Sequence, residues 1–184
     1  LNSATRPDRT GNPNLQPEQS DSLELGLRHQ FNADHRVELS AYRTRVDDLI
    51  SFSGGETYHA INIARADIDG VELEYDGHIG AFTFIANATV QDAENRDTGL
   101  DLLRRPGQKG TLRVDYTFTG GASIGTEVFG SGTRQDFDGP LPGYGLVHLV
   151  GSLPFGERWR LGVRLENVMD RDYEVLSGYN TPGR

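Results

Sequence analysis

Residues 111–118 read Thr111-Leu112-Arg113-Val114-Asp115-Tyr116-Thr117-Phe118. Every second side chain in this run is apolar, and the side chains between them are polar or charged. Successive side chains of a β-strand point to opposite faces of its sheet, so this pattern predicts a strand with one apolar face and one polar face.

The same alternation recurs along the whole chain, and no segment shows a sustained period of 3.6 residues. It predicts further strands at Ser22–Phe31, Arg36–Phe52, Ile61–Tyr75, Ala81–Gln91, Ala122–Ser131, Gly145–Leu153 and Trp159–Leu165. Within the second of these, the phase of the pattern changes near Tyr42–Val46. That change indicates either a bulge or the point where the strand leaves a membrane. The chain is therefore expected to be all-β, with about eight antiparallel strands.

The connections between these strands alternate strictly between short and long. The short ones are Asn32–His35, Asp76–Gly80, Thr119–Gly121 and Pro154–Glu157. The long, polar ones are Ser53–Ala60, Asp92–Arg105, Arg134–Tyr144 and Asp170–Arg184. Transmembrane β-barrels sort their loops in this way, whereas both ends of a soluble sandwich face water. A soluble β-sandwich that binds a ligand such as carbohydrate remains an alternative, because its core would show the same side-chain pattern.

A barrel gives each face of the strands a role. The apolar set would contact lipid and the polar set would line the lumen, including Arg113, Asp115, Arg160, Arg164 and Glu166. Aromatic residues lie near the predicted strand ends, where interfacial girdles form: Tyr75, Tyr116, Phe118 and Trp159.

Composition excludes several classes of protein. Mean hydropathy is −0.54, and no apolar run approaches the roughly 18 residues of a membrane helix. The absence of cysteine excludes a disulfide framework, and a net charge of −9 argues against nucleic-acid binding. The chain starts at Leu1 without a signal-like segment, so we expect the natural N-terminus of an exported protein to lie upstream.

Candidate chemistry is sparse, and we expect neither an enzyme nor a cofactor. His148 has a lumen-facing position, but no serine motif or zinc motif accompanies it. The pair Asp67 and Asp69 resembles a calcium loop only faintly, which favours a structural role. The acidic loop with Asp92, Glu94, Asp97 and Asp101 is interpreted as a solvated loop rather than a cation site.

Three stretches resemble the barrels of TonB-dependent outer-membrane receptors. They are Gly11–Ser20 before a strand, Glu166–Glu174 near the end, and Tyr179–Arg184. This resemblance implies that residues 1–184 are part of a single barrel domain in the bacterial outer membrane. Receptors of this size class have about 22 strands around a plugged lumen. The plug that engages TonB and the last strand would lie outside this chain, and its open edges would need pairing.

Within the family, three shorter stretches are similar to those of cobalamin receptors: Leu102–Arg105, Gly132–Arg134 and Gly178–Tyr179. They imply capture of a bulky, scarce nutrient, cobalamin first, for uptake energised by TonB. A siderophore receptor of the same family is the nearest alternative. A small outer-membrane enzyme or a passive porin is a third hypothesis.

Four loop residues are the predicted substrate-binding set: Arg104, Arg105, Asp136 and Asp138. Guanidinium groups can fork onto carboxylate, phosphate or amide oxygens of an incoming ligand. The resemblance places Arg104 toward the substrate. The two arginines could instead bind lipopolysaccharide phosphates in the surrounding outer-membrane lipid, or pair with Asp97 and Asp101.

Overall fold

The computed structural model describes residues 9–10, 12–53, 58–156, 158–179, 181 and 183–184. In these residues the chain forms one 10-stranded sheet and one 2-stranded sheet, with no helix. Accordingly, this part of the chain has no helix with the length and apolar character needed to cross a membrane. The all-β prediction is confirmed.

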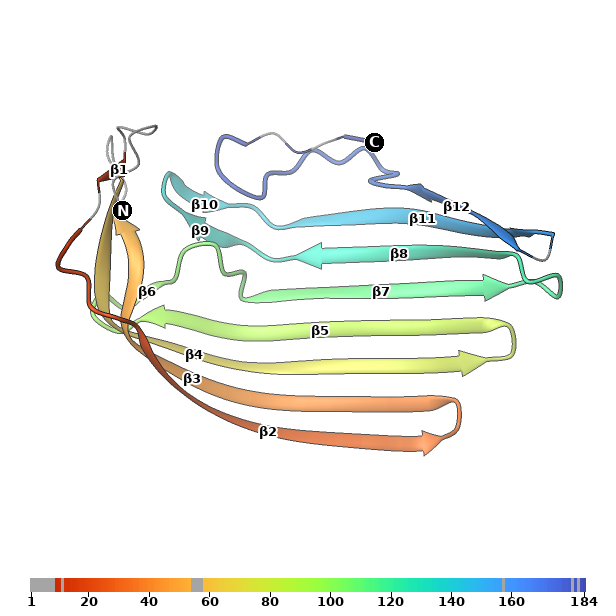
Figure 1. Ribbon diagram of the computed structural model, residues 1–184, viewed down its shortest axis with the longest axis horizontal. Coiled ribbons are helices and arrows are strands. Elements are labelled where there is room, and N and C mark those ends of the chain that lie inside the picture. The colour runs from red at the N-terminus through yellow and green to blue at the C-terminus, as the bar shows by residue number, and fades with distance from the viewer. Residues whose placement is uncertain (1–8, 11, 54–57, 157, 180, 182) are drawn as a thin grey trace.

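Long antiparallel strands form the main sheet, in the order β12-β11-β8-β7-β5-β4-β3-β2 (Figure 1). Their bounds are β2 Gln19–Asn32, β3 His35–Ser53, β4 Tyr58–Ile79, β5 Phe82–Asn95, β7 Gln108–Thr117, β8 Ser123–Ser131, β11 Tyr144–Phe155 and β12 Trp159–Leu165. The shorter strands in the described residues are β1 Arg9–Thr10, β6 Leu100–Asp101, β9 Arg134–Asp136 and β10 Gly139–Leu141. Each predicted strand has its counterpart in the main sheet, paired with its neighbours in chain order.

The strands run further than predicted at the end of the sheet where the long connections were expected. β3 ends at Ser53 and β4 begins at Tyr58, so residues 53 and 58–60 of the connection predicted over Ser53–Ala60 belong to strands. Residues 54–57 lie outside the described residues. The loop predicted over 134–144 contains the β9–β10 hairpin, and the one over 92–105 contains β6. Outside a bilayer a strand need not keep one face apolar, so the alternation did not reveal these extensions.

At the opposite end, three of the short turns are shorter than predicted, whereas the turn predicted over Thr119–Gly121 extends from Phe118 to Ala122. β4 continues to Ile79 and β11 continues to Phe155. Most of the turns expected over Asp76–Gly80 and Pro154–Glu157 therefore belongs to strands. Figure 1 shows these tight turns at the right-hand end of the sheet, and the longer segments gathered at the left-hand end.

Apolar side chains cover one face of the sheet and polar side chains the other. On the apolar face Leu112 lies between Ala86 of β5 and Val128 of β8. Leu25 and Trp159 are 78% and 75% exposed, because no other described part of the chain covers this face. In a barrel the apolar face contacts lipid and the polar face lines the lumen, as predicted.

Aromatic side chains gather on the apolar face at the short-turn end. The ring centroids of Phe82 and Tyr116 are 4.9 Å apart, and those of Tyr116 and Phe118 are 4.8 Å apart. Trp159 pairs with Phe155 across β12 and β11 at this same end. These contacts confirm the predicted aromatic girdle.

The phase change near Tyr42–Val46 is not a bulge, since β3 and β4 keep an unbroken register through it. What changes is the environment of each face. Val46 packs on the lumen side against Ala66, Ala93 and Leu102, the last of which follows β6. The strands therefore extend past the apolar belt, and beyond it their apolar side chains lie on the inner face.

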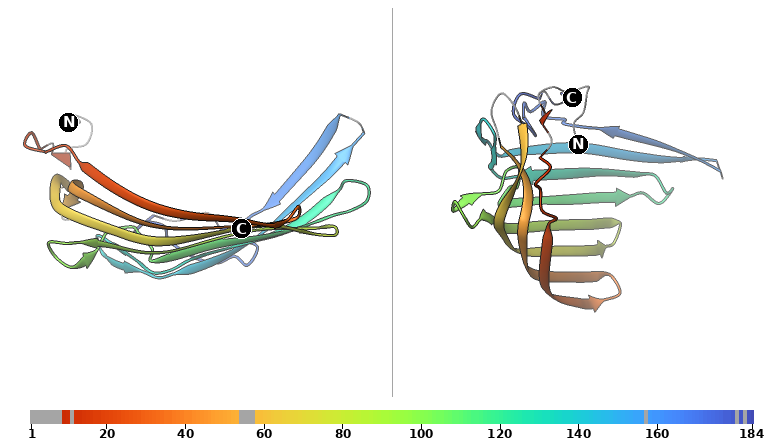
Figure 2. Two further views of the ribbon diagram at one scale, coloured as in Figure 1. Left: turned by 90° about the horizontal axis from the view of Figure 1, so that it is seen from below. Right: turned by 60° about the vertical axis from the view of Figure 1, so that its left-hand side comes forward.

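The sheet is open in the described residues. β2 pairs only with β3, β12 pairs only with β11, and Figure 2 shows a bowed sheet rather than a closed ring. Unpaired strand edges are costly in lipid, so this sheet is a partial barrel whose edges need further strands.

Candidate functional site

Three segments meet at the long-loop end of the sheet: the loop after β6, the β9–β10 hairpin and the segment after β12. Asp136 of β9 joins them, and its side chain is 1% exposed. Its Oδ1 accepts hydrogen bonds from Arg104 Nε and from the Phe137 backbone N–H, both at 2.9 Å. Its Oδ2 accepts one from the Ser177 backbone N–H at 2.8 Å. We call this set of contacts the Asp136 junction.

Backbone and side-chain contacts both hold Arg104 in place. Its φ is 63°, a region that residues other than glycine seldom occupy. Its backbone N–H donates to the Gln135 carbonyl at 2.7 Å, and its guanidinium lies 5.0 Å from the centre of the Phe137 ring. The structure thus pairs Arg104 with Asp136. Its side chain remains 44% exposed, so part of the guanidinium still faces solvent.

Arg105 and Asp138, the other two predicted residues, are exposed. Within the described residues the Arg105 side chain makes no hydrogen bond or ion pair, and its charge acts on the Tyr42 hydroxyl at the inner face. That hydroxyl donates to Gln91 Oε1 at 3.2 Å, and Gln91 Nε2 donates to the Pro106 carbonyl at 3.0 Å. Arg105 therefore lies beside the lumen with its donors available.

Arg134 is a buried anchor that the sequence analysis did not identify as a site residue. It is 6% exposed and donates to the backbone carbonyls of Glu174 and Val175, the latter at 3.2 Å. Its guanidinium lies 5.4 Å from the Tyr144 ring centre, and the Tyr144 and Tyr173 ring centroids are 4.6 Å apart with the rings tilted by 31°. Only its place in the Gly132–Arg134 resemblance pointed to it.

The Glu166–Glu174 stretch begins with a tight turn built around Asn167. The Asn167 side chain accepts from the Arg171 N–H at 2.9 Å and donates to the Arg171 carbonyl at 3.0 Å. Its own backbone N–H donates to His148 Nδ1 at 3.0 Å. Asn167 has a φ of 47°, which asparagine tolerates better than most residues. His148 therefore fastens the chain after β12 to β11.

The Asp136 junction has a definite pH dependence. Burial raises the pKa of Asp136, but the hydrogen bonds from Ser177, Arg104 and Phe137 together leave that pKa below its ordinary 3.8. The junction is thus stabilised above the ordinary pKa, and this stabilisation is lost as the pH falls through the lowered value of the folded form. We expect hydrogen exchange at Ser177 and Phe137, corrected for intrinsic rates, to stay slow to about pH 4 and to accelerate below it.

The matched control for this experiment is Asp136→Asn, whose corrected exchange should not change over the same pH range. Loss of protection in the wild-type protein already above about pH 5 would contradict a lowered pKa.

Comparison with known proteins identifies the family. A family model described as "TonB dependent receptor-like, beta-barrel" matches residues 2–168. The chain belongs to the TonB-dependent receptor β-barrel family. Proteins of this family are transport receptors of the bacterial outer membrane, so the apolar face contacts that membrane. Membership in this family also excludes the soluble β-sandwich, which the strand pattern alone had left as an alternative fold.

Several solved structures share the fold of the chain. The copper transporter OprC is similar with a TM-score of 0.77 at 22% identity, over 88% of this chain and 26% of its own. The ferric-catecholate import receptor Fiu from K12 E. coli has a TM-score of 0.70 at 21% identity, over 98% and 27%. The ferric yersiniabactin uptake receptor FyuA from Yersinia pestis has a TM-score of 0.70 at 22% identity, over 90% of this chain and 27% of its own. The chain thus spans about a quarter of the length of these receptors.

Proposed function

We propose that this chain forms the ligand-facing part of a receptor that captures a bulky, scarce nutrient for uptake energised by TonB. The carrying observation is the Asp136 junction, in which one carboxylate, 1% exposed, holds three loop segments at the long-loop end of the barrel. Segments ordered before binding lose less conformational entropy when the ligand arrives. The chemistry is binding rather than catalysis, and TonB would act through a plug domain.

The first candidate ligand is cobalamin. Arg105 offers an exposed guanidinium beside the inner face, and the exposed part of Arg104 lies next to it in the chain. Both can donate pairs of hydrogen bonds to amide or phosphate oxygens of a large ligand. In this proposal Arg105 contacts the ligand directly. Arg104 and Asp136 shape the surface, and Asp138 contributes from the hairpin tip.

The second candidate is a ferric siderophore. Two of the similar structures, a ferric-catecholate import receptor and a ferric yersiniabactin uptake receptor, are named for such ligands. An exposed guanidinium would donate hydrogen bonds to the anionic oxygens of a siderophore as well as to the oxygens of cobalamin. The two candidates therefore need a direct comparison.

The test is equilibrium binding of cyanocobalamin, and separately of a ferric catecholate, to a complete receptor polypeptide that contains this segment. We expect Arg105→Ala to weaken binding of the preferred ligand about tenfold, since a hydrogen bond to a charged group contributes about 1.5–3 kcal/mol. Arg104→Ala should weaken it as well, through the loosened junction. Arg43→Ala removes an arginine from the outward face and should leave affinity unchanged.

The outcomes separate the candidates. Binding of the ferric catecholate without binding of cyanocobalamin would select the siderophore receptor. Unchanged affinity in Arg105→Ala for whichever ligand binds would remove Arg105 from the site. Binding of neither probe would overturn both assignments.

A further inference from the structure

The outward face of the sheet changes character abruptly at the long-loop end of the apolar belt. The last apolar row on β3, β4 and β5 consists of Ala41, Val71 and Val90, whereas on β2 the apolar side chains continue from Leu25 to Leu23, one row further. The next row on the same face carries Arg43, Asp69 and Asp92 on β3, β4 and β5, and the row beyond carries Arg45, Asp67 and Glu94. Charged side chains therefore lie directly above the belt, on the outside of the barrel.

The height of these charges follows from the length of the belt. On β5 the apolar outward side chains run from Phe82 to Val90. This length matches the roughly 9–11 residues that a tilted strand needs to cross the hydrocarbon core. The aromatic girdle marks the short-turn boundary, so the charged rows lie at the headgroup level of the other leaflet.

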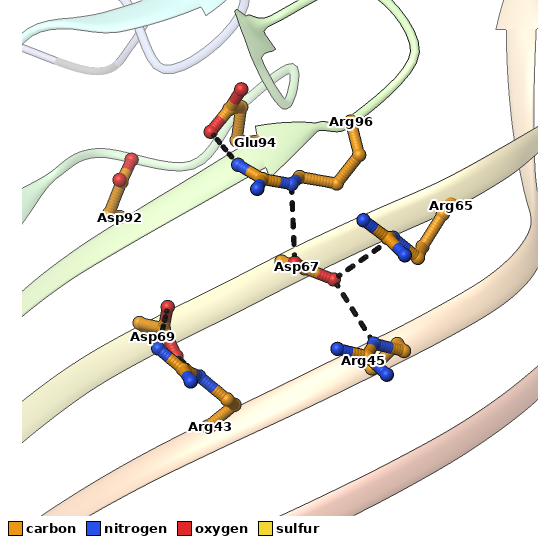
Figure 3. Close-up of a pocket in the computed structure, with 8 residues that line it drawn as sticks. All are labelled: Arg43, Arg45, Arg65, Asp67, Asp69, Asp92, Glu94 and Arg96. Atoms are coloured by element: carbon orange, nitrogen blue, oxygen red, sulfur yellow. Dashed lines mark hydrogen bonds and ion pairs between the residues drawn. The ribbon is translucent and has the colours of Figure 1, made fainter.

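Some of these charges already neutralise one another (Figure 3). Arg43 grips Asp69 through two hydrogen bonds, of 2.5 and 3.0 Å. Arg96 donates to Glu94 at 2.7 Å. The side chains in these pairs have few hydrogen-bonding groups left for a ligand.

Asp67 is different, because several arginines share it loosely. Its carboxylate lies 3.7 Å from Arg45, 3.7 Å from Arg65 and 3.3 Å from Arg96. A separation of 3.7 Å is too long for a hydrogen bond. Within the described residues, Arg45 and Arg65 make no side-chain hydrogen bond, and they are 52% and 42% exposed. Figure 3 shows both guanidiniums converging beside Asp67.

The cavity between these side chains holds about 240 Å³ and joins an apolar groove below it. That groove is lined by Leu25, Ala41, Val71 and Val90, and it shares Arg43, Asp69 and Asp92 with the charged cavity. The lining of the cavity carries four arginines and four carboxylates, so its formal charges cancel. An anionic group would therefore be held by the loosely paired Arg45 and Arg65, with an acyl chain in the groove below. Free inorganic phosphate would use only the upper part.

We propose that Arg45 and Arg65 bind a phosphate group of a phosphorylated glycolipid of the outer leaflet, whose acyl chain occupies the groove over Val71 and Val90. Two guanidiniums with free donors can each fork onto phosphate oxygens. Asp67 competes with the phosphate for the same guanidiniums and sets the affinity. This site depends on the orientation of the barrel in the membrane and not on the nutrient that is transported.

The test is titration of a complete receptor polypeptide, purified in detergent, with bisphosphorylated lipid A, followed by native mass spectrometry. We expect the double variant Arg45→Gln/Arg65→Gln to bind at least about tenfold more weakly. The matched control Arg28→Gln removes a lumen-facing arginine that pairs with Glu38, and it should bind as the wild type does.

A second variant is expected to strengthen lipid A binding, an effect that misfolding could not produce. Asp67→Asn removes the competing negative charge and should strengthen lipid A binding about fivefold. Unchanged binding in Arg45→Gln/Arg65→Gln, or weaker binding in Asp67→Asn, would overturn the proposal. Displacement of the lipid by millimolar inorganic phosphate would likewise overturn a glycolipid as the occupant. Nutrient binding should be unaffected by all three substitutions, so failure here is distinguishable from failure of the proposed function.

Discussion

Replacing Asp136 with alanine is expected to release the loops at the long-loop end of the barrel from one another. The substitution leaves the partly buried N–H groups of Ser177 and Phe137 without their acceptor, and each such loss costs up to about 1–3 kcal/mol. The contribution of Arg104 is smaller, because its side chain is 44% exposed and water can replace the carboxylate. We therefore expect hydrogen-exchange protection in residues 134–141 and 174–178 to fall about a hundredfold.

Asp138→Ala is the matched control for this effect. It removes the same functional group from the same hairpin, at an exposed position, and protection should not change. The affinity for the transported nutrient should fall together with protection in Asp136→Ala. Normal protection in Asp136→Ala would show that the three segments are ordered independently of the junction.

Leu112→Arg is expected to destabilise the barrel in lipid by about 2–4 kcal/mol. Leu112 lies in the middle of the apolar belt, between Ala86 and Val128, where an arginine would meet hydrocarbon. The measurement is reversible unfolding of the complete receptor in lipid vesicles with increasing denaturant.

The control places the same side chain one residue away. Thr111 pairs with Asn87 and Phe129 on the lumen side, so Thr111→Arg should change the free energy of unfolding by less than about 1 kcal/mol. Equal destabilisation by the two variants would contradict the assignment of faces.

The membrane-spanning part of the fold was predictable because lipid imposes a strict pattern on it. Every outward position of residues 111–118 had to be apolar, so the alternation identified the strand and its faces. Beyond the belt this constraint ends. The phase change at Tyr42–Val46 was visible in the sequence, but two explanations fitted it. Only the unbroken β3–β4 register excludes a bulge.

The candidate site was less predictable, because its contacts join residues far apart in the chain. Arg104 and Asp136 were both identified from their residue types, yet no local pattern indicates that they meet 32 residues apart. Asp97 and Asp101, the carboxylates nearer in sequence, were the partners considered. Arg134 was missed as a site residue for a related reason. Its partners are backbone carbonyls of Glu174 and Val175, which carry no sequence signal.

The abrupt end of the apolar belt fixes how the barrel responds to bilayer thickness. Aromatic rings hold its short-turn boundary, and the row with Arg43, Asp69 and Asp92 holds the other. In a bilayer with a thicker hydrocarbon core, the apolar belt is shorter than the core. The barrel cannot shift to bury one more row of side chains, because that row would carry three charged side chains into hydrocarbon. Hydrophobic mismatch must then be relieved by the lipids, which would thin around the protein. A receptor that contains this segment would thus sample the thinnest regions of the outer membrane.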